Sequence, residues 1–174
     1  SGTAGIIFQF PLYAGIMGIV KYSGLVAVLA NGMAGNPEIT EKNEDYRAFV
    51  QALTALCKKL SKMLAGDGEG ATKLLECKVS GAKDKDTAKT VAKSVVCSSL
   101  TKAAMFGSDA NWGRVLCAIG YSGADVDVNK IDVWFKSDKG SILVCENGAG
   151  VDFSEEKAKE ILSENEIDIL VDLK

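Results

Sequence analysis

The stretch SEEKAKEILSENEIDILVD, residues 154–172, decides the fold class of this chain. Ser154 is a residue type that caps helix N-termini, and the two glutamates after it suit the positive end of a helix dipole, so a helix is predicted over EEKAKEIL. Apolar side chains then alternate with Asp168, Leu170 and Asp172; they are Ile167, Ile169 and Val171. This period of two is typical of a strand with one buried face. A helix that leads into such a strand indicates helices layered on a sheet.

The sequence before this stretch contains further helix and strand patterns. Apolar residues recur at three- and four-residue spacing from Tyr46 to Leu64, which predicts a helix that Gly66 stops. Beyond it we predict a strand over Thr72–Val79 and then a helix that is capped by Asp86 and reaches Val96. A short strand over Leu100–Phe106 and a helix from about Ala110 to Tyr121 are predicted next. Two further strands are predicted over Ile131–Phe135 and Ser141–Cys145. The predicted class is α/β, or α+β layered, with a mixed sheet packed by helices. No nucleotide-binding GxGxxG or GxxxxGKS/T loop occurs.

The first part of the chain differs in composition from the rest. Residues 1–37 carry one charged side chain, Lys21, and residues 1–24 form an atypical apolar segment. Two buried strands, Ile6–Phe10 and Ile16–Tyr22, are predicted there with a turn at Pro11, followed by a third apolar run over Leu25–Ala30. Polar interruptions of the run argue against a membrane-spanning helix. The length of 174 residues suits a single domain over residues 1–174.

Charge and residue counts exclude several classes of protein. The net charge of -3 offers no positive field for nucleic acid or an anionic membrane. The absence of histidine excludes Ser-His and Cys-His nucleophile pairs and HExxH zinc sites. The five cysteines contain no CxxC pair, so no metal site is expected, and they are interpreted as small core residues of a protein from a reducing cytoplasm; they are Cys57, Cys77, Cys97, Cys117 and Cys145.

Two loop motifs are candidate binding sites. In DGEGATK, residues 67–73, glycines flank Glu69, and Glu69 with Lys73 could hold the two charged ends of an amino acid; the alternative is a turn with a surface ion pair. In FGSDANWGR, residues 106–114, a helix N-terminus and Arg114 could hold a carboxylate; the alternative is that Asp109 or Asn111 only caps the helix.

Five segments together carry a resemblance to a known family: LANGMAGNPE, DYRAF, DGEGATKL, FGSDANWGRVLCAIGYSGAD and ENGAGVDFSEEKA. Residues 25–174 resemble the β-chain region of ornithine acetyltransferase, also called glutamate N-acetyltransferase or arginine biosynthesis bifunctional protein. The resemblance implies a cytoplasmic acyltransferase of arginine biosynthesis that cleaves itself into α and β chains. It implies that a threonine at the new N-terminus takes acetyl from N-acetylornithine and passes it to glutamate, without a cofactor. We also expect a homo-oligomer.

Carried over residue by residue, the resemblance implies a substrate contact at Glu69 and supporting positions around the cleft at Lys73, Asn111 and Arg114. The family's threonine-led strand and its final strand are not matched here, and the early Thr3 follows Ser1-Gly2, which blocks its amine. Thr3 is a candidate nucleophile only if those two residues are removed. Two hypotheses stay open: a β chain that works with an α partner, or an inactive engineered or truncated derivative that serves folding or self-assembly. We expect this chain alone to be inactive.

Overall fold

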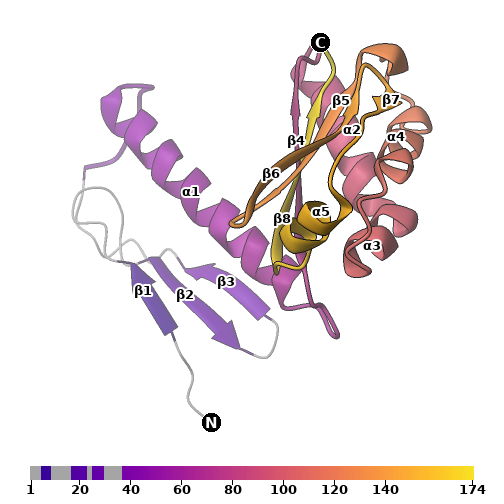
Figure 1. Cartoon of the computed structure of the whole chain (residues 1–174). Helices are drawn as coiled ribbons and strands as arrows, with labels where there is room; N and C mark the ends of the chain where they lie inside the picture. The colour runs from indigo at the N-terminus through magenta and orange to yellow at the C-terminus, as the bar shows by residue number, and fades with distance from the viewer. Residues whose placement is uncertain (1–4, 9–16, 23–24, 30–36) are drawn as a thin grey trace. The chain divides into compact units, whose positions relative to one another are not determined.

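The structure is a computed structural model that describes the backbone of the strands within residues 5–8, 17–22 and 25–29, and the whole of residues 37–174 (Figure 1). The chain divides into two compact units, residues 1–71 and 72–174. Each unit is described by itself. That the chain forms the single domain expected from its length stays a prediction.

The first unit contains a three-stranded antiparallel sheet and one long helix. Its strands are β1 (Gly5–Phe8), β2 (Met17–Tyr22) and β3 (Leu25–Leu29), paired in the order β1-β2-β3. β1 and β2 confirm the two strands predicted from the sequence, and the third apolar run also forms a strand, β3. The turn at Pro11 lies outside the described residues. The helix α1 (Glu44–Gly66) is also confirmed, and it begins where the side chain of Asn43 accepts a hydrogen bond of 3.0 Å from the N–H of Tyr46.

The second unit is built on a five-stranded mixed sheet in the order β4-β8-β5-β6-β7 (Figure 1). The central strand β8 pairs in parallel with β4 and antiparallel with β5, and the remaining pairs are antiparallel. The strands are β4 (Leu74–Ser80), β5 (Asp132–Ser137), β6 (Gly140–Glu146), β7 (Ala149–Gly150) and β8 (Glu166–Asp172). The mixed sheet confirms the predicted fold class.

Four α-helices accompany this sheet, together with a 3-10 turn at Val128–Lys130: α2 (Lys85–Cys97), α3 (Ser99–Phe106), α4 (Trp112–Gly120) and α5 (Glu155–Leu162). Ile167, Ile169 and Val171 of β8 are buried in one core together with side chains from all four helices. Because alternate residues of a strand point to opposite faces, the helices cover the face of the sheet that carries these three residues. The strand predicted from the alternation in residues 166–172 is therefore confirmed, with its buried face as expected.

The structure corrects one element type. The segment Leu100–Phe106 was predicted as a strand, but it lies in helix α3. Ser98 caps this helix, and its buried residues follow three- and four-residue spacing at Thr101, Ala104 and Met105. Leu100 and Phe106, the two large apolar residues at the ends of the segment, are exposed. The strand prediction rests on the hydrophobicity of this segment. Because its two large apolar residues are exposed, that prediction is wrong.

Two smaller predictions are also corrected. Helix α2 is capped by Asp84 and not by Asp86, because the Asp84 carboxylate accepts a hydrogen bond of 2.7 Å from the N–H of Thr87. The cysteines do not all lie in the core: Cys145 is buried and Cys77 is half-buried, whereas the other three described thiols are exposed, at Cys57, Cys97 and Cys117. The three exposed cysteines lie on helix surfaces, where a single small apolar side chain reduces stability little.

Candidate functional site

Glu69 lies in the turn that follows helix α1, in the first unit. The N–H of Ala71 donates a hydrogen bond of 2.9 Å to the carbonyl of Gly68, which closes the turn around Glu69. Gly70 has φ of 71°, in the left-handed region that favours glycine, so the second glycine of the motif is needed for the backbone path. The Glu69 side chain is exposed, and its carboxylate is therefore accessible to a ligand.

Lys73 is the second residue of the second unit, just before strand β4, and its ammonium lies at the C-terminal end of helix α5. Its Nζ donates to the carbonyl of Leu162, to the Ser108 hydroxyl at 3.4 Å and to the carbonyl of Glu164 at 3.4 Å. A cation suits the carbonyls at this end of a helix. Burial lowers the pKa of Lys73, and the negative charge of Glu164 opposes that shift.

Ser108 joins the two sequence motifs. It lies in the turn between helices α3 and α4, where its φ of 51° places a non-glycine residue in the left-handed region. Its hydroxyl donates a hydrogen bond of 3.1 Å to the carbonyl of Leu162, the same oxygen that Lys73 contacts. The structure thus brings Lys73 of residues 67–73 against Ser108 of residues 106–114.

Asn111 is the cap of helix α4. Its Oδ1 accepts a hydrogen bond of 3.2 Å from the N–H of Arg114, and its Nδ2 donates to Asp109 at 3.1 Å. The Arg114 guanidinium donates a hydrogen bond of 3.1 Å to the carbonyl of Leu100 in helix α3. Both residues therefore organise the turn between two helices, and Arg114 is half-buried there.

Two contacts near this turn were not singled out by the sequence. Trp112, the first residue of α4, packs directly on Gly150 in β7, and a Cβ atom at Gly150 would lie 2.7 Å from its Cε2 atom. The second is the contact of the Ser108 hydroxyl with Lys73 and the carbonyl of Leu162. A serine in a turn and a glycine in a two-residue strand carry no periodic or charge signal, so only their spatial neighbours reveal what they do. Thr3, the candidate nucleophile, lies outside the described residues.

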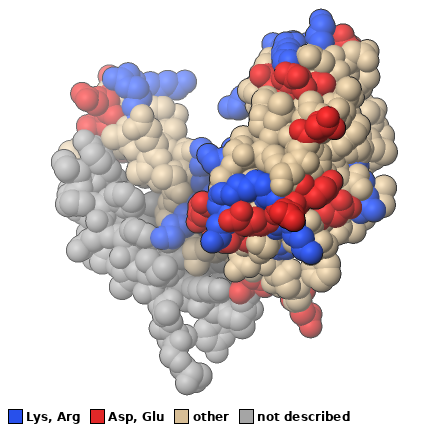
Figure 2. Space-filling model, viewed as in Figure 1, with Lys and Arg blue, Asp and Glu red and all other residues tan. Residues whose placement is uncertain are grey.

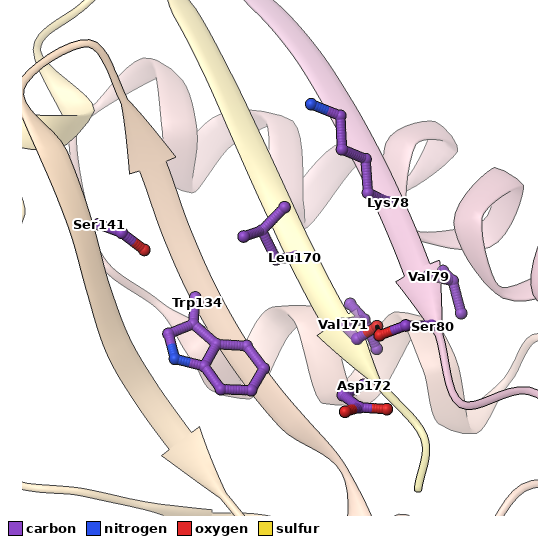
Figure 3. Close-up of a pocket in the computed structure, with 8 residues that line it drawn as sticks. All are labelled: Lys78, Val79, Ser80, Trp134, Ser141, Leu170, Val171 and Asp172. Atoms are coloured by element: carbon purple, nitrogen blue, oxygen red, sulfur yellow. Dashed lines mark hydrogen bonds between the residues drawn. The ribbon is translucent and has the colours of Figure 1, made fainter.

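The face of the sheet opposite the helices carries a shallow pocket of about 450 Å³ (Figure 3). Trp134 of β5 and Leu170 of β8 lie across from each other in the sheet register and form its apolar part. Lys78 of β4 borders the pocket, and its ammonium pairs with Asp168 at 2.6 Å. The pocket is an amphipathic surface, separate from the contacts made by Lys73.

Charged side chains of both signs lie side by side on the face shown in Figure 2. Ion pairs of this kind include Lys157 with Glu160 at 2.9 Å. The described residues contain no group of three or more acidic or cysteine side chains placed to hold a metal ion. Within the same residues, none of the helices is long and apolar enough to cross a membrane.

The fold and these motifs define a mixed α/β protein with two loops that carry charged groups, and comparisons with known proteins assign its family. The model of the ArgJ family matches residues 22–174, and the chain belongs to the ArgJ family. This assignment confirms the resemblance to the arginine biosynthesis bifunctional protein.

Individual relatives give the extent of the similarity. The arginine biosynthesis bifunctional protein ArgJ of Caldanaerobacter subterraneus subsp. tengcongensis is 52% identical over 147 residues, which are 84% of this chain and 36% of that protein. The protein of the same name from Thermotoga neapolitana is 44% identical over 157 residues, 90% of this chain and 40% of that protein. The crystal structure of the protein from Bacillus halodurans is similar with a TM-score of 0.76 and 43% identity, covering 83% of this chain and 66% of that chain. This chain therefore spans well under half the length of these two curated relatives.

Proposed function

We propose that this chain is the β-chain portion of a glutamate N-acetyltransferase of arginine biosynthesis, which moves acetyl from N-acetylornithine to glutamate. The observation that carries the proposal is the family match over residues 22–174, which includes the complete DGEGATK motif with the exposed carboxylate of Glu69. An exposed carboxylate on a glycine-flanked turn suits the ammonium group of an amino-acid substrate, because charge-assisted hydrogen bonds are the stronger ones.

The other predicted residues take supporting roles in this proposal. Asn111 and Arg114 hold the turn between α3 and α4 through the hydrogen bonds described above. The oxyanion donors of the tetrahedral intermediate are assigned to an α partner. The nucleophilic threonine is assigned to the threonine-led strand that opens the family's β chain, which this chain does not match. Acetyl transfer through a threonine ester needs no cofactor, since the hydroxyl accepts the acyl group and the second amine removes it.

A graft tests the function directly. Residues 22–174 replace the matching segment of the Caldanaerobacter relative, and formation of N-acetylglutamate from N-acetylornithine and glutamate is followed, with the parent protein as the positive control. We expect activity, and a loss of roughly ten- to a hundredfold in kcat/KM for Glu69→Gln, because a hydrogen bond to a charged group contributes about 1.5–3 kcal/mol. Glu156→Gln, an exposed carboxylate in the first turn of α5, is the matched control and should change little. A folded but inactive graft beside an active parent would contradict the proposal and favour the scaffold hypothesis.

The source of the nucleophile has its own test. The full chain alone is incubated with N-acetylornithine and its intact mass is measured, and we expect no acetyl adduct. An adduct that glutamate removes, and that Thr3→Ala abolishes, would show that this chain carries its own nucleophile. That result would overturn the assignment of the nucleophile to a threonine-led strand that this chain does not match.

A further inference from the structure

Helix α1 of the first unit carries exposed apolar side chains along one line. Val50, Cys57 and Leu64 are all exposed, and each follows the one before it by seven residues. Seven residues make nearly two turns of an α-helix, which has about 3.6 residues per turn, so these side chains lie almost directly above one another. Tyr46, four residues before Val50, is exposed on the same side of the helix. We name these four residues the α1 stripe.

The α1 stripe is separate from the side of the helix that is buried. The buried residues of α1 are Leu56 and Leu60, which lie roughly 60–100° around the helix axis from Cys57. The apolar face of α1 is therefore wider than its buried part. Seven large apolar side chains are exposed in the described part of the chain, and three of them belong to the α1 stripe. This concentration on one helix face indicates an interaction surface.

The neighbours of the α1 stripe permit close packing of a second helix. Thr54 and Ser61 lie beside the line and have small side chains. The Ser61 hydroxyl donates a hydrogen bond of 2.8 Å to the carbonyl of Cys57, so it keeps a partner when water is excluded. A straight apolar line with a seven-residue period is the kind of surface through which helices pair in coiled coils.

The α1 stripe is symmetric about Cys57, and this symmetry indicates which helix fits it. Val50 lies seven residues before Cys57, and Leu64 lies seven residues after it. If two copies of α1 run antiparallel about a two-fold axis at Cys57, Val50 of each copy meets Leu64 of the other, and the two Cys57 side chains meet at the axis. The line is therefore complementary to itself, as the interface of a two-fold dimer must be.

Charge favours the antiparallel orientation over the parallel one. The first turn of α1 contains Glu44 and Asp45, and its C-terminal half contains Lys58, Lys59 and Lys62. In a parallel pair the lysines of one helix would lie at the level of the same lysines of the other. In an antiparallel pair the acidic start of each helix points toward the basic half of the other, and the two helix dipoles oppose each other.

We propose that a second copy of this chain binds the α1 stripe, with the two α1 helices packed antiparallel around a two-fold axis at Cys57. The stripe from Tyr46 to Leu64 is about 27 Å long at about 1.5 Å per residue. A contact of this length between two helices is smaller than a standard interface of about 1,600 Å², so we expect a weak dimer with a Kd in the micromolar range.

Sedimentation equilibrium on the full chain measures this self-association. We expect a monomer–dimer equilibrium whose Kd rises at least about tenfold in Leu64→Glu, because two carboxylates then enter the apolar line. Ala55→Glu, exposed on the opposite side of α1, is the matched control and should change the Kd by less than about twofold. Circular dichroism checks that each variant keeps its helix content. A parent chain that stays monomeric at about 1 mM, or a dimer that Leu64→Glu does not weaken, would overturn the proposal.

A charge swap tests the orientation of the two helices. Val50→Lys alone should weaken the dimer as Leu64→Glu does. The double variant should return the Kd to within about threefold of the parent value, because the new lysine of each copy meets the new glutamate of the other. In a parallel pair position 50 meets position 50, so the double variant would lose more than either single variant. That additive loss would refute the antiparallel pairing.

The Cys57 thiol reports on the two-fold axis directly. Oxidation of the full chain with copper phenanthroline should link two copies through Cys57, because a residue at the axis meets the same residue of the other copy. Cys97 and Cys117 are also exposed, so Cys57→Ser should abolish the linked dimer, whereas Cys97→Ser and Cys117→Ser should keep it. Equal linkage in Cys57→Ser and the parent chain would show that the axis does not lie at Cys57.

Discussion

Gly150→Ala should destabilise the second unit through a single steric overlap with Trp112. Gly150 lies in strand β7, and its φ is outside the left-handed region, so the backbone itself accepts alanine. The added Cβ would lie 2.7 Å from Cε2 and 3.0 Å from Nε1 of the indole, and closer still to Cζ2. The comfortable separation of such atoms is about 3.5–4.0 Å. The indole must therefore move by about 1 Å or the strand must shift.

The expected cost follows from the behaviour of overpacked cores. Extra methyl groups in a well-packed site typically cost about 1–3 kcal/mol. Trp112 is partly buried against the core of the second unit, so it cannot move freely into solvent. In a domain of roughly 100 residues each kcal/mol lowers Tm by about 4–8 °C. A fall in Tm of roughly 5 to 20 °C is therefore expected for Gly150→Ala.

The assay is thermal unfolding for the Tm and urea unfolding for the free energy, both followed by circular dichroism, for the wild type, Gly150→Ala, Trp112→Phe and the double variant. Phenylalanine lacks the part of the indole that meets the new Cβ, so Gly150→Ala should cost less than about 1 kcal/mol in the Trp112→Phe background. Gly113→Ala is the control, because its nearest neighbour, Asn111 Oδ1, would be at 3.6 Å and alanine favours the helix. An equal cost of Gly150→Ala in both backgrounds would refute the overlap as its cause.

Two further predictions concern helix capping and acid stability. Asp84→Ala should lower the free energy of unfolding by about 0.5–2 kcal/mol, because Asp84 caps α2, and Asp86→Ala should lower it by less. Thermal unfolding measures both variants. A larger loss for Asp86→Ala than for Asp84→Ala would contradict the observed cap. Asp132 is buried, which by itself raises the pKa of its carboxyl, but hydrogen bonds from Lys174 and the N–H of Asn147 hold that pKa below its ordinary 3.8. Its stabilising contribution is therefore complete above pH 3.8 and is lost as the pH falls through the lowered folded-state pKa. Asp132→Asn should show a shallower loss of stability in that acid range by circular dichroism, and an unchanged acid slope would contradict the shift.

Local sequence patterns were sufficient for most of the elements. The alternation in residues 166–172 predicted β8 and its buried face, because a strand with one face in a core must place apolar side chains at every second position. Ser154 predicted the start of α5, since a cap depends only on residues within one turn; its hydroxyl accepts from the N–H of Lys157 at 3.2 Å. The long motifs also sufficed to predict the family.

Helix α3 shows where local patterns fail. The apolar run predicts a short strand over Leu100–Phe106, yet Leu100 and Phe106 are both exposed. Thr101 is buried instead, and its hydroxyl donates to the carbonyl of Arg114 at 3.4 Å. A short apolar run fits a helix or a strand equally well, and its partners in the fold decide between them.

The candidate site divides in the same way. By itself the sequence determined the Glu69 turn, the cap of α5 and the family, because each depends on residues close together in the chain. For α4 it left Asp109 and Asn111 as alternative caps, and the structure shows Asn111. Only the tertiary structure decided that Lys73 ends on helix α5 beside Ser108 and that Trp112 rests on Gly150. Lys73 lies 35 positions from Ser108 and 89 positions from Leu162 in the sequence. No local propensity encodes which distant carbonyl a lysine side chain will reach.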